Sequence, residues 1–479
     1  MRGHSIGGFG SVTTNKVIAS IAADLFGKQV QAYPKYGSEK KGLPTSYYLT
    51  VADEHVRTHT ELEQVEFVAL HDANAFNMGN PLAGLVPGGM LFLNTDRATP
   101  EEVWATLPPA AQRRIAQHRI RVFALDTLRI ARDCAPTADL LLRMQGIALL
   151  GVFLRVAPFR EERGLSEEAL LKSIEKSLRK YFGKRGEAVI EANMKAVQRG
   201  FQEVFEVPVP AAARAEAEKV PETKPQASVP EQVDVRTAPL VDAQLFHERV
   251  IDGYNRGAEP ELEADLFIAR SLMPPATAAW RDFSQLAPDI PEFIPDKCVG
   301  CMECVTLCPD TAILAKVVEP ATLDPALAAH GDTIPRLREQ FTRTQKYYTI
   351  LEKKGTGGGL FGIFIDPSKC KGCGECVVVC GTHEALRMVP KSAEKLDWYH
   401  KAFNFFRKLP PTPPRFVSER ALADIMLSEH ATPMYVGGAG SCMGCGEAPA
   451  IRMLLAATAF QYGPESIGLV AATGCNTVY

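Results

Sequence analysis

The sequence lacks a long uncharged apolar run, an excess of charge of either sign and an apolar leader. Its most apolar stretch, residues 138–157, contains Arg143, Gln145 and Arg155. These side chains would be costly at bilayer depth, so we expect a buried helix there and no membrane span. A formal net charge of -3 provides no basic field, which argues against nucleic acid and anionic membranes as partners. Residues 1–10 are rich in glycine and have no signal-peptide core, so we expect a cytoplasmic protein.

Eight of the twelve cysteines form two runs with the same spacing, Cys-x2-Cys-x2-Cys-x3-Cys. The runs are Cys298, Cys301, Cys304 and Cys308, followed by Cys370, Cys373, Cys376 and Cys380. This spacing is typical of a two-cluster ferredoxin, in which the fourth cysteine of each run binds the cluster of the other run. We therefore predict that Cys380 completes the first [4Fe–4S] cluster and that Cys308 completes the second. A disulfide framework and structural zinc are the alternatives, but disulfide scaffolds are short secreted chains and zinc knuckles usually come as separated pairs.

The turns of the two cysteine runs differ in one respect. Pro309 follows the first run, as in bacterial ferredoxins, whereas Gly381 occupies the corresponding position of the second run. This departure concerns a turn and leaves the ligands intact. Gly300, Gly372 and Gly374 lie between ligands, where a small residue lets backbone N–H groups approach cluster sulfurs.

The length of 479 residues predicts roughly two to four domains. Residues 1–206 alternate short apolar runs with helical periodicity, which predicts an α/β domain with a largely parallel sheet. Strands are expected at 30–33, 47–50, 67–70, 90–93 and 120–125, and helices at 16–26, 138–156, 166–182 and 186–205. The remaining chain is divided into a flexible linker at 207–240, a connecting segment at 241–290, a ferredoxin-like domain at 291–390 with an insertion at 309–365, a connector at 391–429, and a third unit at 430–479 that we expect to be truncated.

Other polar and glycine-rich positions allow two interpretations. Residues 7–10, Gly-Gly-Phe-Gly, could bind a phosphate, but they lack the G-x-G-x-x-G spacing and no clear strand precedes them, so close packing is favoured. His4, His71 and Asp72 could be site residues, although satisfied loop groups are more common. Cys134, in an apolar helical region, is interpreted as a free buried thiol.

Three further thiols, Cys442, Cys445 and Cys475, lie close to glycines. On spacing alone they could form a zinc site that lacks one ligand, or be buried free cysteines.

The order of these segments resembles the pyruvate:ferredoxin oxidoreductase superfamily of 2-oxoacid oxidoreductases. The resemblance rests on the glycine-rich opening at residues 2–16, the double ferredoxin motif, the segment Cys-Met-Gly-Cys-Gly-Glu at 442–447 and Ala-Thr-Gly-Cys at 472–475. It implies a multidomain α/β and α+β protein. Residues 1–206 would be a gamma-type α/β domain, the middle a ferredoxin-like delta domain with two [4Fe–4S] clusters, and the last part the start of an α/β thiamine-diphosphate domain.

The resemblance also implies two cofactor sites near the end of the sequence. Cys442, Cys445 and Cys475 would hold a third [4Fe–4S] cluster, with a fourth ligand beyond residue 479. Glu447 would face thiamine diphosphate and its Mg2+, and Gly474 would lie on a turn that approaches this cofactor. The alternative for Glu447 is a carboxylate that stabilises the start of a helix.

A coenzyme A loop is implied near residue 40. Lys40, Gly42 and Thr45 are in register with the family's Lys-Ser-Gly-Gly-x-Thr loop, whereas Lys41 and Leu43 depart from it. A lysine there could meet the phosphates of coenzyme A. A solvated basic loop is the alternative.

The activity implied by the resemblance is coenzyme A-dependent oxidative decarboxylation of a 2-oxoacid, with pyruvate or 2-oxoglutarate as the substrate. Electrons would pass through three clusters to ferredoxin or a similar low-potential carrier. The sequence has no Gly-Asp-Gly segment for Mg2+ and diphosphate, and its catalytic residues stay unassigned. We therefore expect activity only with missing domains or with a partner chain that carries the pyrimidine-binding and substrate domain. We also expect a dimer of protomers. The alternative is a non-catalytic iron–sulfur electron-transfer subunit of a larger redox complex.

Overall fold

The computed structural model describes residues 1–35, 44–57, 60–71, 73–76, 80–137, 140–217, 242–255, 262, 274, 282–330, 334–428, 441–470 and 475. The chain divides into two compact units. Unit 1 comprises Met1–Gly37 and Pro44–Ala276, and unit 2 comprises Ser38–Leu43 and Thr277–Tyr479. Within the described ranges, no helix is both long enough and apolar enough to cross a lipid bilayer.

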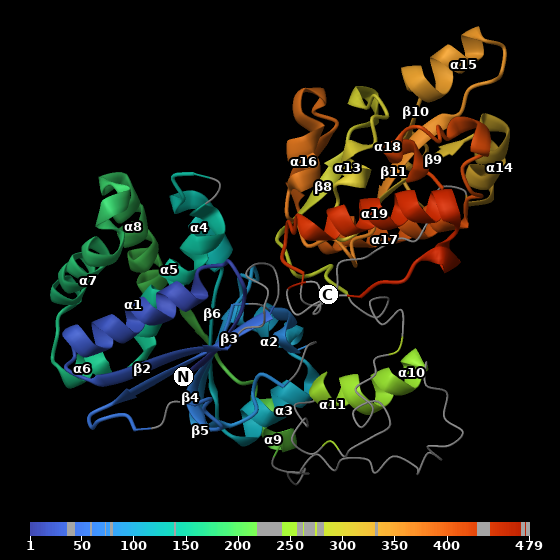
Figure 1. The fold of residues 1–479 in the computed structure, drawn as a ribbon. Coiled ribbons are helices and arrows are strands. Elements are labelled where there is room, and N and C mark those ends of the chain that lie inside the picture. The colour runs from blue at the N-terminus through green and yellow to red at the C-terminus, as the bar shows by residue number, and fades with distance from the viewer. Residues whose placement is uncertain are drawn as a thin grey trace. The chain divides into compact units, whose positions relative to one another are not determined.

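Unit 1 is built on a seven-stranded sheet with the order β2-β3-β1-β4-β5-β6-β7 (Figure 1). The strands are β1 (Arg2–Ile6), β2 (Gln29–Lys35), β3 (Pro44–Ala52), β4 (Val65–Leu70), β5 (Leu85–Asn94), β6 (Arg121–Leu125) and β7 (Phe205–Val207). The central strands β1, β4, β5 and β6 are parallel. The flanking strands β2, β3 and β7 pair antiparallel, so the predicted parallel sheet forms the centre of a mixed one.

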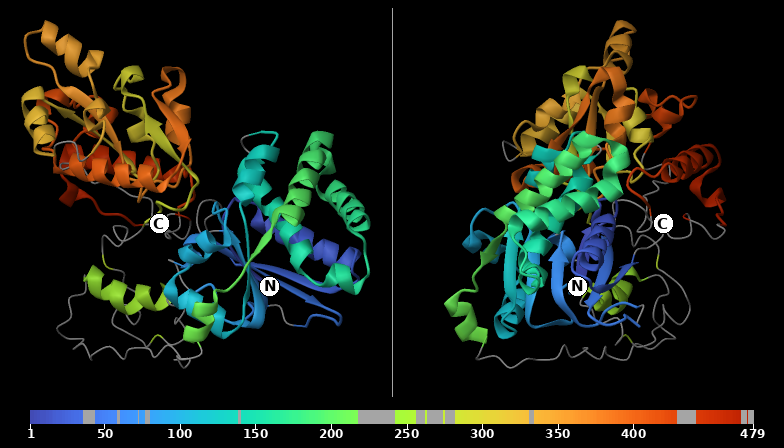
Figure 2. Two further views of the ribbon diagram at one scale, coloured as in Figure 1. Left: turned by 180° about the vertical axis from the view of Figure 1, so that it is seen from behind. Right: turned by 90° about the vertical axis from the view of Figure 1, so that its left-hand side faces the viewer.

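Helices cover both faces of this sheet (Figure 2). They are α1 (Ser11–Asp24), α2 (Pro100–Thr106), α3 (Pro109–Gln117), α4 (Thr127–Cys134), α5 (Leu141–Val156), α6 (Phe159–Glu162), α7 (Glu167–Phe182), α8 (Glu187–Glu203) and α9 (Ala211–Ala217). Helices α10 (Ala243–Phe246) and α11 (Asp252–Asn255) also belong to unit 1, where Phe246 and Val250 form a small apolar cluster of their own. Alternate residues of each strand point to opposite faces. Thus Phe92 packs with α1, α5, α7 and α8, whereas Leu91 packs with α2 and α3.

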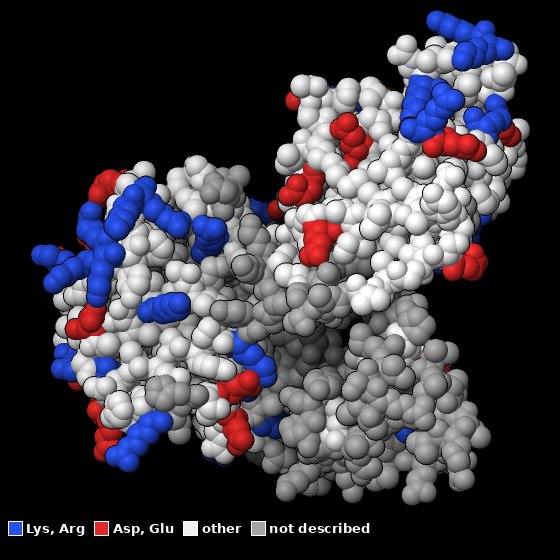
Figure 3. Space-filling view, in the orientation of Figure 1, with Lys and Arg blue, Asp and Glu red and all other residues white. Residues whose placement is uncertain are grey.

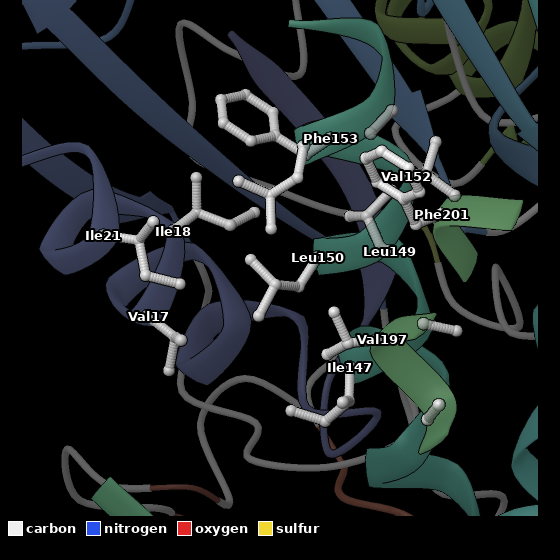
Figure 4. Close-up of a cluster of buried hydrophobic side chains, with 14 of the residues drawn as sticks. Val17, Ile18, Ile21, Ile147, Leu149, Leu150, Val152, Phe153, Val197 and Phe201 are labelled. Atoms are coloured by element: carbon white, nitrogen blue, oxygen red, sulfur yellow. The ribbon is translucent and has the colours of Figure 1, made fainter. Parts of the chain in front are cut away.

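Helix α5 is buried on all sides, as its apolar sequence predicts. In Figure 4, Leu150 points toward Val17 and Ile18 of α1, and Leu149 lies near Phe201 of α8. Glycines in both helices let the backbone of α5 pack directly against the backbone of α8. A Cβ atom on Gly151 would lie 2.1 Å from a carbonyl oxygen of α8, so no larger residue fits there without a shift.

Two predictions for unit 1 were wrong. Strand β1 precedes the glycine-rich segment, where we expected no clear strand. The strand escapes recognition because Arg2 and Ser5 are polar, although both are buried in the sheet. The expected linker does not begin at residue 207, since Val207 belongs to β7 and α9 packs Ala213 against the core. The favoured interpretation of residues 7–10 fits the structure, because a Cβ on Gly10 would lie 2.8 Å from the carbonyl oxygen of Arg143.

Unit 2 contains two antiparallel strand pairs of matching topology. Its strands are β8 (Asp289–Phe293), β9 (Ile313–Val318), β10 (Phe341–Thr342), β11 (Leu360–Ile365) and β12 (Leu386–Pro390), and its helices are α13 (Glu303–Thr306), α14 (Pro320–His330), α15 (Ile350–Lys353), α16 (Glu375–Cys380), α17 (Ala393–Lys408), α18 (Leu422–Ile425) and α19 (Glu447–Tyr462). Strand β8 pairs with β12, and β9 pairs with β11. Each pair therefore joins the strand before one cysteine run to the strand after the other.

The segments expected as an insertion and a connector belong to the core of unit 2. The insertion supplies β9, α14, β10, α15 and β11. Helix α17, which lies in the expected connector at 391–429, packs Phe403 and Phe406 against Phe364 of β11. The connector is therefore structural, because it covers one face of the three-stranded sheet β10-β11-β9.

Candidate metal centres

Two cavities in unit 2 are lined by the eight cysteines of the two runs. The first, which we call the Cys298 cavity, is lined by Cys298, Cys301, Cys304 and Cys380. The second, which we call the Cys370 cavity, is lined by Cys308, Cys370, Cys373 and Cys376. Each leaves about 330 Å³ of space between atoms, part of it open to solvent. The structure thus groups three cysteines of one run with the last cysteine of the other, in the combination that the spacing predicts.

The strand pairing explains how the fourth cysteine of each run reaches the other cavity. Cys308 and Cys380 end their runs just before β9 and β12, which pair with the strands that precede the opposite run. Backbone amides hold both sulfurs in place in an equivalent way. The N–H of Ala312 donates to Cys308 Sγ at 3.3 Å, and the N–H of Ala385 donates to Cys380 Sγ at 3.2 Å.

The loops around the cavities depend on left-handed backbone conformations. Gly300 and Gly372 occupy equivalent positions with φ of 75° and 68°. Gly381, which replaces the second proline of the bacterial pattern, has φ of 53°. Proline cannot adopt a positive φ, so the turn after the second run requires glycine.

The cysteines are crowded in an environment that disfavours charge. Burial raises the pKa of Cys298 to about 11, and a hydrogen bond from the backbone of Gly300 only partly opposes this. Burial likewise raises the pKa of Cys370 and Cys373 to about 12. Four such thiols can ionise together only beside a cationic centre, so the donor set fits an iron–sulfur cluster, whose iron supplies that charge. Within the described ranges, no three His, Cys, Asp or Glu side chains meet at one point as ligands of a single metal ion would.

A third thiol-bearing segment lies beside the Cys370 cavity. Residues 441–447, which we call the thiol loop, carry Cys442 and Cys445 and lead into α19. A Cβ on Gly444 of this loop would lie 3.2 Å from Glu375 Oε1 and 3.6 Å from Cys373 Cβ. The thiol loop is therefore in contact with the second cysteine run.

Buried cations hold the thiol loop and the helix that follows it. Lys371 Nζ donates to the carbonyl of Ser441 at 2.9 Å and to its Oγ at 2.7 Å. The same Nζ lies 3.0 Å from Asp310 Oδ1, and both side chains are buried, at 0% and 3% exposure. Arg452 of α19 is also fully buried, and its guanidinium donates to the carbonyls of Val305 and Cys308.

The sequence analysis missed these cations, although a signal was present. Asp310 follows Cys308 by two positions, and Lys371 directly follows Cys370. Because the spacing assigned Cys308 and Cys370 to one cluster, the opposite charges of Asp310 and Lys371 beside them could have indicated an ion pair. Burial raises the pKa of Asp310, and the charge of Lys371 opposes that shift.

Basic side chains gather over β10 and α15 of unit 2 (Figure 3). The exposed basic residues of this segment are Arg343, Lys346, Lys353 and Lys354. The segment adjoins the Cys298 cavity, because a Cβ on Gly300 would lie 3.0 Å from the ring of Tyr347. Val299, in the same cysteine loop, is 43% exposed, so this cavity lies close to the surface of unit 2.

The other predicted site residues are only partly described. Glu447 is the first residue of α19 and is exposed, and Cys475 is exposed. Gly474 lies outside the described residues, as do Lys40 and Gly42. Thr45 is buried in β3, opposite Ser5 of β1.

Of the two candidate histidines in unit 1, His71 is buried and His4 is half-buried. His71 Nε2 lies 2.9 Å from Tyr47 Oη, and burial lowers the pKa of His71 to about 4. Burial also lowers the pKa of His4 to about 3. These are satisfied, neutral groups, as the more common interpretation predicted, while Asp72 lies outside the described residues. Cys134 is a buried free thiol, as expected.

Comparison with known proteins matches parts of both units to family profiles. Residues 291–314 and 363–386 each match the profile of a 4Fe–4S binding domain, so the chain contains two such domains. Residues 1–203 match the profile described as pyruvate ferredoxin/flavodoxin oxidoreductase. The chain therefore carries a domain of the pyruvate ferredoxin/flavodoxin oxidoreductase family, followed by two 4Fe–4S binding domains.

Two curated relatives are similar to almost the whole chain, and one solved structure is similar to part of it. Pyruvate:ferredoxin oxidoreductase of Moorella thermoacetica is 26% identical over 478 residues, which cover 99% of this chain and 36% of that protein. A probable pyruvate-flavodoxin oxidoreductase of Escherichia coli is 27% identical over 483 residues, with the same two coverages. A pyruvate oxidoreductase subunit of Thermotoga maritima, known from a crystal structure, is 24% identical, with 43% of this chain and 97% of that chain covered and a TM-score of 0.33. The chain thus spans 36% of the length of each of these two curated relatives.

Proposed function

We propose that this chain is part of a 2-oxoacid oxidoreductase and that unit 2 conducts its electrons. The observation that carries the proposal is the composition of the two cavities, each lined by three cysteines of one run and the fourth of the other. This is the ligand arrangement of a two-cluster ferredoxin. Clusters bound by these residues would accept electrons one at a time from the site where the substrate is oxidised and pass them to an external carrier.

The two cavities have different neighbours, which gives each a different role. The Cys370 cavity adjoins the thiol loop, through Gly444 beside Cys373 and Ser441 beside Lys371. The Cys298 cavity adjoins the exposed Val299 and the basic segment over β10 and α15. We infer that the Cys370 side faces the site of substrate oxidation and that the Cys298 side faces the carrier, a ferredoxin or flavodoxin.

The remaining cofactors are proposed from the family resemblance and from the residues that match its motifs. Cys442, Cys445 and Cys475 would provide three ligands of a third [4Fe–4S] cluster, and Glu447 and Gly474 would border thiamine diphosphate with its Mg2+. Thiamine diphosphate would supply the electron sink for decarboxylation. The position of Cys442 and Cys445 beside the Cys370 cavity supports this, because electrons would pass from such a site directly to a cluster in that cavity.

The acceptor of the acyl group would be coenzyme A. Lys40, Gly42 and Thr45 would bind it, and the lysine would meet its phosphates. Pyruvate and 2-oxoglutarate are the proposed substrates. A partner chain or a further part of the protein would bring the pyrimidine-binding and substrate domain, and the protomers would form a dimer in the cytoplasm.

The test is anaerobic iron and sulfide analysis of the native complex, with EPR of the reduced protein and an assay for bound thiamine diphosphate. About twelve iron atoms for each copy of this chain, together with thiamine diphosphate, would support a three-cluster oxidoreductase. About eight iron atoms without thiamine diphosphate would instead establish a non-catalytic electron-transfer subunit. Reduction of the clusters by pyruvate or 2-oxoglutarate in the presence of coenzyme A would then identify the substrate.

A further inference from the structure

A buried ion pair connects three segments that each border a candidate metal centre. Asp310 lies two residues after Cys308, and Lys371 directly follows Cys370. Ser441, which accepts two hydrogen bonds from Lys371, directly precedes the first cysteine of the thiol loop. One ammonium group therefore contacts the wall of the Cys370 cavity and the thiol loop at the same time.

Stability alone does not explain this arrangement. Burying an ion pair costs desolvation energy, and replacement by apolar residues of similar size is often neutral or stabilising. Unlike an apolar side chain, an ammonium group forms directional hydrogen bonds, and its N–H donors fix the positions of the acceptors. Here the acceptors are a carboxylate beside one ligand and a loop that bears another thiol pair, so the bonds fix their separation.

A second buried lysine in the same unit has acceptors of a different kind from those of Lys371. Lys316 is also fully buried, and its Nζ donates to the carbonyls of Phe406 and Leu409 at 3.0 and 2.8 Å. These two carbonyls lie at the end of α17, and neither belongs to a cysteine run or to the thiol loop. Lys316 therefore offers a matched control for the loss of a buried ammonium.

We propose that Lys371 is a positioning residue with two effects, which rest on the proposed electron-transfer function of unit 2. It ties the thiol loop to the wall of the Cys370 cavity, so that the cysteines of the thiol loop stay at a constant distance from the cysteines of the cavity. Its positive charge, balanced by Asp310, also sets the reduction potential of a cluster held in that cavity. Asp310 and Lys371 thus act as one element, in which the carboxylate limits how far the ammonium raises the potential.

The experiment compares four variants of the native complex with the wild type. Lys371→Met combined with Asp310→Asn removes both charges without leaving one of them unpaired. Asp310→Asn alone keeps the bonds from Lys371 to Ser441 and removes only the negative charge. Ser441→Ala removes one acceptor, and Lys316→Met is the control. The readouts are hydrogen–deuterium exchange of residues 441–447 and redox titration of the clusters followed by EPR.

For the double variant we expect the thiol-loop amides to exchange about ten- to hundredfold faster, since hydrogen bonds to a charged group are lost. Asp310→Asn should leave this exchange unchanged and raise the potential of one cluster, and the double variant should return that potential toward the wild-type value. Loss of a purely structural contact would not shift a potential in this pattern. Lys316→Met should alter neither the loop nor the potential.

The proposal is overturned if exchange of the thiol loop in the double variant equals that in Lys316→Met, or if Asp310→Asn leaves every cluster potential unchanged. If the double variant fails to assemble, Ser441→Ala decides, with an expected increase in exchange of about three- to tenfold. Iron content reports the proposed function separately. A complex without clusters would refute that function, whereas the exchange measurement would still test the tie between Lys371 and the thiol loop.

Discussion

The crossed grouping of cysteines predicts a specific pattern of non-additivity between substitutions. Each single Cys→Ala change at the eight positions should remove one ligand and with it one cluster, which lowers the iron content by about four atoms per chain. Cys298→Ala combined with Cys380→Ala affects a single cavity. Such a double variant should therefore lose no more iron than either single variant.

A different pair from the same run gives the opposite result. Cys298→Ala combined with Cys308→Ala affects both cavities, so the iron content should fall by about eight atoms per chain. If each run instead held its own cluster, the Cys298 and Cys308 variant would lose about four iron atoms per chain and the Cys298 and Cys380 variant about eight. The assay is iron and acid-labile sulfide analysis of anaerobically purified complex, with EPR spin counting of the reduced clusters.

The reasoning is refuted if the Cys298 and Cys380 variant loses about twice as much iron as its single variants. The control is Cys134→Ala, because this buried thiol lies in unit 1 at the end of α4 and should leave the iron content unchanged. Circular dichroism would show whether all variants keep the wild-type secondary structure. The comparison uses only ratios between variants, so iron at a third centre adds the same amount to each measurement.

Three further predictions concern packing, pH and charge. Gly151→Ala should destabilise unit 1 by about 3 kcal/mol, since its Cβ would lie 2.1 Å from a carbonyl oxygen of α8, and urea denaturation would measure this. His71 has a folded-state pKa of about 4 because it is buried, so its contribution to stability is full above pH 6.5 and is lost as the pH falls toward 4. The loss should reach about 3 kcal/mol, and His71→Gln should flatten the pH dependence of the urea midpoint. Lys353→Gln with Lys354→Gln should slow reduction of an acidic carrier protein by about tenfold at low ionic strength.

Matched controls accompany these predictions. Gly183→Ala should be nearly neutral, because a Cβ there meets nothing within 4 Å. Lys401→Gln with Lys408→Gln removes the same charge from α17 and should not slow the carrier. Reduction of a neutral dye should be unchanged in both lysine variants. A carrier rate that is insensitive to salt in the wild type would contradict the proposed role of the basic segment.

Sequence patterns located most of unit 1 and the cysteine groups of unit 2. The strands from β2 to β6 and the helix α5 follow from apolar periodicity, which depends only on local sequence. Strand β1 was missed because Arg2 and Ser5 interrupt its apolar pattern, and their burial depends on partners far along the chain. Arg2, for example, donates to the carbonyl of Pro81.

The candidate site divides in the same way. Cysteine spacing predicted which thiols share a cavity, because the repeated run is the ligand pattern of a two-cluster ferredoxin, in which the fourth cysteine crosses over. The link from Lys371 to Ser441 follows no such pattern and depends on how residues 441–447 pack, so spacing could not predict it. The extent of the linker was wrong because α9 is short and alanine-rich, and only its packing against the core shows that it is structured.

The exchange of strands between the halves of unit 2 has a consequence for how such a unit could arise. Since β8 pairs with β12 and β9 with β11, a half that carries one cysteine run contains only one partner of each strand pair. It also contains only three of the four thiols of one cavity and one of the four thiols of the other. A half-length ancestor could therefore complete a cavity only as a dimer of two copies. Gene duplication and fusion would then join the two copies covalently and leave each free to acquire its own neighbours.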